Sequence, residues 1–298
     1  MAVLTRPKTR RTREPVTSAR THRGRGRYLI GAMCLAICTV MLLPLVMSTL
    51  ASVKPTAEAA ASPPTYFPHS ISLDSYHRLW SYQQGLPTYL ANSLGAALLT
   101  IAFTLLLTVP AAYSLARFPL PGKEFIFIVL LLALIVPYQA LLTPMFLMFA
   151  KVKLTNSLVG LAILHTAIQL PFSLYILRNS FSAVPRELEE AATVDGAGSF
   201  GVFRHVILPL SKPVIAVTAF FGFLAGWTEF YFSWAFLQAP KDWTLAMALN
   251  GMVGQYAANT KWSEFAAFAI LVAVPVAVVY LFLQRYIISG LTVGGVKG

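Results

Sequence analysis

Three carboxylates stand at the start of a polar segment between two long apolar runs, and their spacing sets the chemistry that the segment can do. Glu187, Glu189 and Glu190 follow Pro185, which suits the first turn of a helix because its missing N–H is unneeded there. Near the positive end of a helix dipole, each carboxylate is stabilised by ~0.3–1 kcal/mol. We therefore expect a short acidic helix that can offer Glu190 to an Arg or Lys of a partner protein.

The residues after these carboxylates favour a rigid helix that ends abruptly. Ala191 and Ala192 are small and strong helix formers, so the helix can press closely into a groove. Gly196 permits the left-handed conformation that ends a helix, and Asp195 can hold the turn. Residues 182–213 are thus predicted to form a helix, a turn and a second helical stretch, able to transmit motion between subunits. The plainer alternative is an amphipathic loop with ordinary capping residues.

No catalytic constellation accompanies this segment. The sequence contains no HExxH, no GxxxxGK[ST] phosphate loop and no cluster of metal ligands, so we expect no catalytic or metal-binding residue in this chain. Cys34 and Cys38 lie four apart on one face of an apolar helix. A metal or redox pair is one interpretation, but packing of two small polarisable side chains in a membrane helix is favoured.

Polar and aromatic side chains within the apolar runs are candidates for a translocation path. Gln139, Trp227, Glu229 and Phe230 form this set. An acid at membrane depth is a functional hypothesis by default, and aromatic rings can stack on a sugar. The alternative places Glu229 at the outer headgroup level among interface aromatics.

Two further polar residues, His165 and Gln169, also lie in an apolar run. Hydrogen bonds between helices, each contributing ~0.6 kcal/mol in membranes, explain them adequately. A role in solute contact is the alternative for both residues, and equally for Gln139.

These segments require membrane helices to position them. The chain has 298 residues, of which 57% are apolar and 11% charged, whereas soluble domains have about 25% charged residues. Several apolar runs reach the roughly 20 residues that cross a bilayer. The pattern predicts an all-α, polytopic membrane protein with six transmembrane helices, at about 28–50, 90–115, 125–149, 157–177, 213–236 and 265–287.

The net charge of +12 does not indicate nucleic-acid binding, because of where the charge lies. Residues 1–27 carry nine Lys or Arg and one acid, which favours a disordered basic tail outside the transmembrane domain of residues 28–298. A signal peptide is the competing interpretation of 28–50, but this apolar run is too long for one. The Lys/Arg bias favours cytoplasmic N- and C-termini, although Lys151 and Lys153 oppose it.

The segment Glu190-Ala-Ala-Thr-Val-Asp-Gly196, followed by Val206-Ile-Leu-Pro209, resembles the signature loop of binding-protein-dependent ABC importer permeases. Val206 departs from the pattern, since Ile is more usual there. The resemblance implies that the loop 178–212, including Glu187, couples to a separate ATPase. The positions that fit the family spacing are Glu190, Ala191, Ala192, Asp195, Gly196, Ala197, Phe203, Leu208, Pro209 and Pro213.

More of the chain is similar to the second permease subunit of maltose-type, carbohydrate importers. The matching stretches are Asn92-Ser93, Pro137-Tyr-Gln139, Pro144, Leu154-Thr-Asn-Ser157, Phe223 to Phe230 and Ser289 to Gly298. Thr228 departs from this pattern, because the family often has Asn there.

The resemblance implies a type I ABC importer permease core in a bacterial inner membrane. Its implied partners are a homologous second permease, two copies of an ABC ATPase that hold ATP and Mg, and an extracytoplasmic solute-binding protein. This chain would bind no cofactor itself. A phosphate, amino-acid or polyamine importer is the alternative within the class. An ion-coupled secondary transporter is the more distant one, since only Glu229 offers an intramembrane acid.

Overall fold

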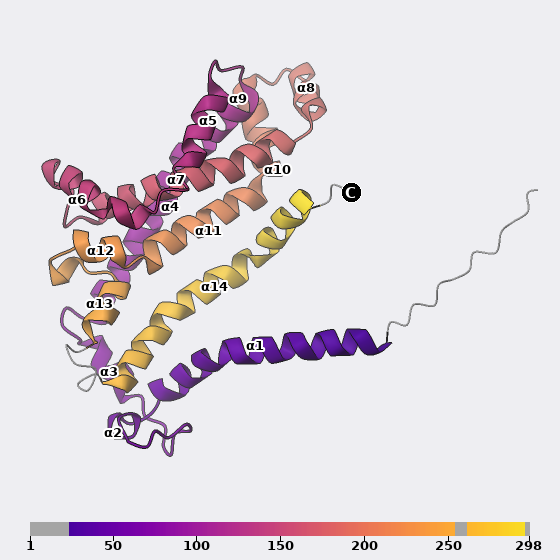
Figure 1. The fold of residues 1–298 in the computed structure, drawn as a ribbon. Helices are drawn as coiled ribbons and strands as arrows, with labels where there is room; N and C mark the ends of the chain where they lie inside the picture. Colours follow the sequence, from indigo (N-terminus) through magenta and orange to yellow (C-terminus); the bar gives the residue numbers. More distant parts are fainter. Residues whose placement is uncertain (1–23, 254–260, 296–298) are drawn as a thin grey trace, which may run out of the picture. The chain divides into compact units, whose positions relative to one another are not determined.

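The computed structural model describes residues 24–253 and 261–295, and no β-strand occurs in these ranges. Figure 1 shows the helices, with the chain coloured from its N-terminus to its C-terminus. The α-helices are α1 Gly24–Ser52, α2 Thr56–Ala59, α3 Asp74–Trp80, α4 Leu86–Arg117, α5 Lys123–Leu132, α6 Leu142–Lys151, α7 Leu158–Ala183, α8 Arg186–Val194, α9 Ser199–Val202, α10 Leu208–Leu210, α11 Lys212–Thr228, α12 Tyr231–Phe236, α13 Leu245–Gly251 and α14 Trp262–Gly295. Short 3₁₀ or π turns lie at Tyr138–Leu141, Phe203–Ile207 and Pro240–Asp242.

The chain divides into two compact units, Met1–Val46 and Met47–Gly298. Helix α1 forms the described part of the first unit and begins at Gly24, four residues earlier than the span expected from the apolar run. Its segment Tyr28–Ser52 is long and apolar enough to cross a membrane. The expected tail of residues 1–27 lies largely outside the described residues, and its boundary stays a prediction.

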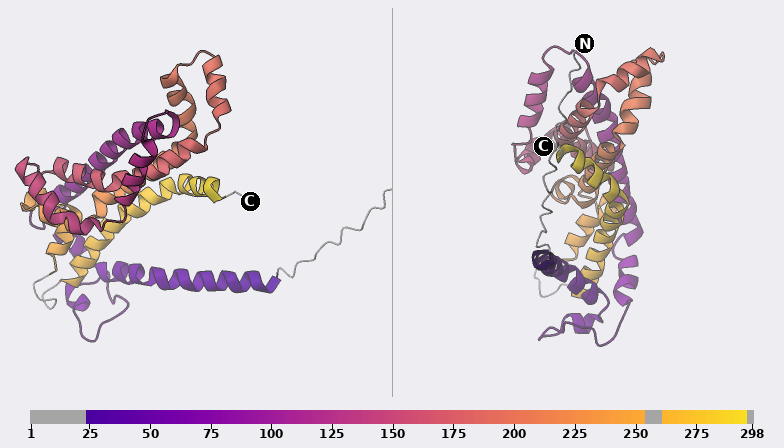
Figure 2. Two further views of the ribbon diagram at one scale, coloured as in Figure 1. Left: turned by 45° about the horizontal axis from the view of Figure 1, so that its top comes forward. Right: turned by 90° about the vertical axis from the view of Figure 1, so that its right-hand side faces the viewer.

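The second unit is built around α4, α7, α11 and α14, which run side by side in both views of Figure 2. Helix α4 packs against both α7 and α11, and α11 also packs against α14. The closest approach is at Gly226 of α11, where a Cβ atom would lie 2.5 Å from the Cα of Ala97 in α4. Glycine is therefore the residue that lets these two helix backbones meet.

The third expected span, 125–149, is not one continuous helix, and whether it crosses the membrane stays a prediction. Helix α5 ends at Leu132 and α6 begins at Leu142, with a 3₁₀ turn between them. Pro137 stands in the gap, and proline both lacks an N–H and disfavours helical backbone in the residue before it. The chain therefore turns between two short apolar helices.

The fifth expected span, 213–236, is also interrupted. Helix α11 ends at Thr228 and α12 starts at Tyr231. Four described helices, α1, α4, α7 and α14, qualify alone as membrane spans, and α11 qualifies together with residues 199–210, to which it is bent by 75°. The count of six spans is compatible with this arrangement but stays a prediction.

Two asparagine side chains form hydrogen bonds to the loops at the end of the bundle opposite α8. Asn92 Nδ2 donates to the carbonyl oxygens of Lys241 and Trp243, at 2.8 and 2.9 Å. Asn156, with a left-handed φ of 52°, accepts from the Gln238 N–H at 2.6 Å. These bonds give a structural reason for asparagine in two of the stretches that the sequence analysis singled out.

Candidate functional site

Residues 182–213 fold as a helix, a turn and a second helical stretch, as expected, whereas the first residues of the predicted coupling loop 178–212 still belong to α7. Helix α8 is followed by α9, by the π turn Phe203–Ile207 and by α10. Gly196 has a φ of +89° and lies just beyond the end of α8, so the predicted left-handed position is confirmed. Pro209 follows the π turn, where its missing N–H removes one helical hydrogen bond. Figure 1 shows α8 and α9 at one end of the bundle.

One side of α8 and α9 is bare. Glu187, Glu190, Ala191 and Asp195 are exposed, together with three apolar side chains that a free surface would not favour. These three are Leu188, Val194 and Phe200, which are 46%, 88% and 72% exposed. Ala192 and Ala197 are half-buried along the same segment. Charge and exposed apolar surface together are typical of a site that meets another protein.

The buried side of α8 is held by an ion pair that the sequence reasoning missed. Arg117, the last residue of α4, places Nη2 2.5 Å from Glu189 Oε1, and the two side chains are 8% and 17% exposed. The same Nη2 donates to the carbonyl oxygen of Val184 at 2.6 Å. The available signal was a lone Arg at the end of a long apolar run, followed 72 residues later by a carboxylate on the predicted helix.

The residues that close the segment belong to the core of the bundle. The Phe203 ring lies 4.7 Å, centroid to centroid, from the ring of Tyr113 in α4. Ile207 is fully buried with Tyr113 and Phe181, and Leu208 is half-buried beside it. Phe203 and Leu208 therefore position the loop, whereas Glu190 and its neighbours are the part that a partner can reach.

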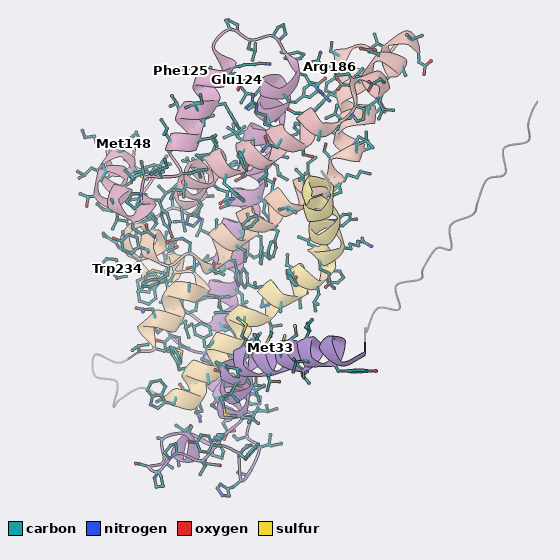
Figure 3. The ribbon with its side chains drawn as sticks, turned by 45° about the vertical axis from the view of Figure 1, so that its right-hand side comes forward. Met33, Glu124, Phe125, Met148, Arg186 and Trp234 are labelled. Carbon is teal, nitrogen blue, oxygen red and sulfur yellow. The ribbon has the colours of Figure 1, made fainter. Side chains whose placement is uncertain are left out.

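A second arginine fastens α5 to α7 at the same end. Arg178 Nη2 lies 2.5 Å from Glu124 Oε1, and its guanidinium carbon lies 3.9 Å from the centroid of the Phe127 ring. Figure 3 shows Glu124 and Arg186 at this end of the unit, and Met148 and Trp234 away from it. Each of the two shorter helices here, α5 and α8, is thus tied to a long apolar helix by one arginine.

A cavity of about 490 Å³ opens where the interrupted spans meet α7. Two of the four candidate path residues, Glu229 and Phe230, line it. Trp227 does not, since it is buried and its Nε1 donates to the Val272 carbonyl at 3.0 Å, and Gln139 is exposed beside the cavity residue Tyr138. The lining residues are Tyr138, His165, Ile168, Gln169, Phe221, Leu224, Ala225, Thr228, Glu229, Phe230 and Tyr231.

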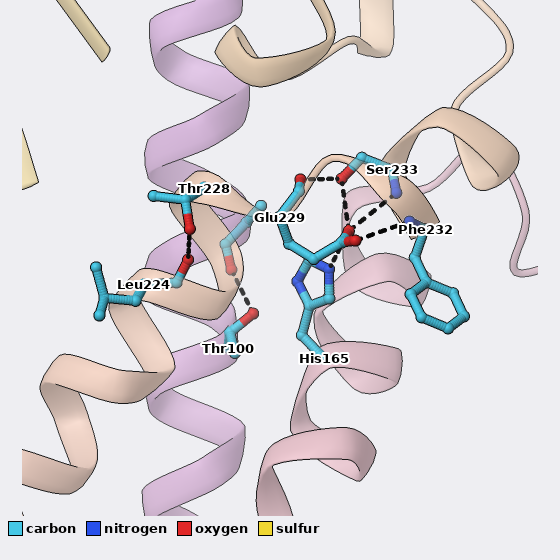
Figure 4. Close-up of polar contacts among 8 residues, drawn as sticks. Thr100, His165, Leu224, Thr228, Glu229, Phe232 and Ser233 are labelled. Atoms are coloured by element: carbon cyan, nitrogen blue, oxygen red, sulfur yellow. Dashed lines mark hydrogen bonds and ion pairs between the residues drawn. The ribbon is translucent and has the colours of Figure 1, made fainter. Parts of the chain in front are cut away.

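The Glu229 carboxylate is fully engaged at the start of α12, as Figure 4 shows. It accepts from the backbone N–H of Phe232 at 2.9 Å and of Ser233 at 3.1 Å, and it lies 3.2 Å from His165 Nε2. These contacts satisfy N–H groups that a new helix leaves unpaired. Glu229 thus restarts the helix after the break, a role that neither interpretation of this residue from the sequence included.

Two polar atoms beside this cluster have no partner among the described residues. They are His165 Nδ1 and Gln169 Nε2, and both atoms are buried. The expected helix–helix hydrogen bond is present for His165, through Glu229, but the Gln169 amide nitrogen makes none. Buried polar groups are normally hydrogen-bonded, so both atoms are free to bond a group outside the chain, and they differ from the other unpartnered buried atoms, such as Thr166 Oγ1, because their residues line the cavity.

The comparisons with known proteins fit this geometry. The model of the family described as binding-protein-dependent transport system inner membrane component matches residues 108–293. A sulfoquinovosyl glycerol transport system permease protein of Agrobacterium fabrum is 34% identical over 257 residues, covering 86% of this chain and 89% of the relative. A galactooligosaccharides transport system permease protein of Bacillus subtilis is 31% identical over 275 residues, covering 91% and 96%.

The fold is also that of solved transporters. A chain of a bacterial ABC transporter involved in the import of the acidic polysaccharide alginate superposes with a TM-score of 0.77, covering 88% of this chain and 97% of that chain at 21% identity. A chain of the MetNI methionine ABC transporter superposes with a TM-score of 0.54 at 16% identity. At these identities the likeness concerns the fold alone.

Proposed function

Because the chain belongs to the family of binding-protein-dependent transport system inner membrane components, we propose that it is the sugar-translocating permease subunit of an ATP-driven importer. Membership makes it a multi-pass inner-membrane protein and a transport subunit, not an enzyme. It also sets aside the ion-coupled secondary transporter considered from the sequence. The curated relatives named above support the sugar class, because both carry sugar-containing solutes in their names.

The observation that carries the proposal is the two-sided character of α8. One side of α8 is locked to the bundle through Arg117 and Glu189, and the other exposes Glu190 and Val194, close in sequence to the exposed Phe200 of α9. A rigid helix held on one side and bare on the other can pass the motion of a docked partner into α4. The partner proposed for this surface is an ABC ATPase, present in two copies, which would hold the ATP and Mg.

Two further partners complete the proposal. A homologous second permease would supply the other half of the pathway, and a solute-binding protein would deliver the sugar from outside the cell. The proposed orientation places α8 and both chain termini in the cytoplasm. The Lys/Arg bias supports it, and so does the need of the α8 surface to meet an ATPase.

The test is a purification of the tagged chain from native membranes in mild detergent, followed by mass spectrometry. An ATPase, a second permease and a solute-binding protein should be recovered. Crosslinking before solubilisation guards against loss of partners in detergent. A sample crosslinked in this way that still lacked any ATPase would refute the proposal.

A matched pair of variants then locates the docking surface. Glu190→Arg reverses an exposed charge on α8 and should reduce ATPase recovery strongly. Lys241→Glu reverses an exposed charge at the opposite end of the bundle and should leave recovery unchanged. Equal recovery with both variants would place the ATPase elsewhere.

A further inference from the structure

We propose that the cavity around His165 and Gln169 is a site where this subunit itself contacts hydroxyl groups of an uncharged, polyhydroxylated solute. The inference rests on the function proposed above and adds to it a location and a chemistry. It concerns residues for which the sequence favoured helix–helix bonding and left solute contact as the alternative.

The cavity lies where two spans lose their helical hydrogen bonds. Residues 133–137 separate α5 from its 3₁₀ turn, and residues 229–230 separate α11 from α12. Non-helical backbone at membrane depth is tolerated only where it is buried in protein or lines a water-filled space. Tyr138, Glu229 and Phe230 come from these two breaks and line the same cavity.

The polar groups of the cavity are arranged along one face of α7. His165 and Gln169 are four residues apart, so both side chains project from the same side of that helix. His165 is 2% exposed, and its Nδ1 has no partner among the described residues, as is also true of Gln169 Nε2. Together they can donate to, or accept from, neighbouring hydroxyl groups of a bound solute.

The charge of the lining selects the class of solute. The lining contains no Lys or Arg, so a phosphate or another anion would find no counter-charge from the described residues. Its single carboxylate, Glu229, is already bound by His165 and two backbone N–H groups, so it has little acceptor capacity left for an amine. A neutral solute with several hydroxyl groups is therefore the class that fits.

Aromatic rings complete the site. Tyr138, Phe230 and Tyr231 line the cavity, and Tyr138 is held by stacking on Phe232 with ring centroids 6.0 Å apart. Mostly apolar walls with a few convergent polar groups are typical of small-molecule sites. The flat rings can cover the C–H face of a sugar while Gln169 reaches its hydroxyl groups.

The experiment compares two identical substitutions in the full chain, expressed in its own bacterium with all its partners. Thr228→Val removes a hydroxyl that lines the cavity, and Thr166→Val removes one from α7 that is buried but does not line it. Gln169→Leu removes the unpartnered amide. Cells receive a ¹³C-labelled carbohydrate extract of mono- to pentasaccharides, and labelled sugars inside the cells are quantified by mass spectrometry against a strain that lacks the chain.

We expect Gln169→Leu to lower the initial uptake rate at least about five-fold, because the amide bonds to the solute are lost. Thr228→Val should lower it by about two-fold or more, because the Thr228 hydroxyl donates to the Leu224 carbonyl and so can only accept from the solute. Thr166→Val should stay near the wild-type rate. The amount of complex in the membrane and its ATPase content should be unchanged in all three, which a purely structural role of Gln169 would not predict. If Gln169→Leu fails to assemble, the comparison of Thr228→Val with Thr166→Val decides the question.

The two proposals fail in different ways. Wild-type cells that accumulate a sugar, with all three variants equal to them, would overturn the cavity site and leave the sugar permease standing. That outcome would point to a side chain of the second permease as the missing partner of Gln169. Wild-type cells that accumulate no labelled sugar beyond the deletion strain would overturn both.

Discussion

Arg117 and Glu189 join the end of α4 to the buried side of α8 through a contact of 2.5 Å between Nη2 and Oε1. The same guanidinium also holds the Val184 carbonyl, which lies just before α8. The position of the exposed helix is therefore set by one side chain of a long apolar helix. Any displacement of α8 must move α4 with it or break this pair.

Removing either partner of this pair should release α8. Arg117→Met leaves the Glu189 carboxylate largely buried without a counter-charge, and breaking a buried pair costs roughly 3–5 kcal/mol. We expect α8 to become sensitive to protease and ATP hydrolysis by the reconstituted complex to lose its dependence on the binding protein. Lys212→Met, which removes an exposed positive charge nearby, is the control.

The double variant Arg117→Glu with Glu189→Arg sharpens this test. It restores opposite charges, but the new carboxylate cannot donate to Val184, so we expect only partial recovery of protease resistance. Equal protease resistance of Arg117→Met and the wild type would contradict the role assigned to the pair.

Substitution of Gly196 should destabilise the turn because of the backbone conformation at this residue, not because of contacts with neighbouring atoms. Nothing lies within 4 Å of a Cβ built there, but its φ of +89° is strained for other residues. Gly196→Ala should destabilise the turn by roughly 1–2 kcal/mol and reduce ATPase recovery in the crosslinking purification. Gly198→Ala is the matched control, since Gly198 has a φ of −71° and equally open space, and it should recover the ATPase normally.

Substitution of Gly226 should be destabilising because of contacts with neighbouring atoms, not because of the backbone conformation. A methyl group there would lie 2.5 Å from the Cα of Ala97, so Gly226→Ala must push α11 away from α4. We expect a clear drop in the thermal unfolding temperature of the purified complex. At Gly222 the nearest atom would be 3.4 Å away, so Gly222→Ala should unfold near the wild-type temperature. Similar unfolding temperatures for both variants would mean that the helices are less tightly packed than described.

The main contribution of Glu229 to stability should be that it caps the start of α12. Glu229→Ala removes the acceptor for the Phe232 and Ser233 N–H groups, and loss of such a cap costs about 0.5–2 kcal/mol. Glu229→Gln keeps one acceptor oxygen and should lose less stability. Thermal unfolding of the two variants measures the difference, and equal stability of Glu229→Ala and the wild type would remove the capping role.

The sequence predicted the helical class, the helix–turn–helix form of the loop and the left-handed Gly196, because each depends on local residue preferences. It also placed the first, second, fourth and sixth apolar runs correctly. Their composition alone makes them helices of spanning length, whatever surrounds them.

The two breaks in the third and fifth apolar runs could not be predicted from composition. An apolar run of 25 residues looks continuous in composition, and only Pro137 marked the first break. The second break depends on Glu229 accepting N–H groups three and four residues later and on its contact with His165 from another helix. Arg117 and Glu189 were likewise invisible as a pair, because their meeting depends on the packing of α4 against α7.

The two arginine pairs also limit the order in which parts of the bundle can form while the chain is synthesised. Arg117 is made 67 residues before Val184, and Glu124 is made 54 residues before Arg178. Both early charges must stay hydrated while the ribosome produces α7 and the start of α8. The end of the bundle that carries α8 therefore closes late in synthesis, and a truncated chain that stops before Arg178 would leave both without their partners.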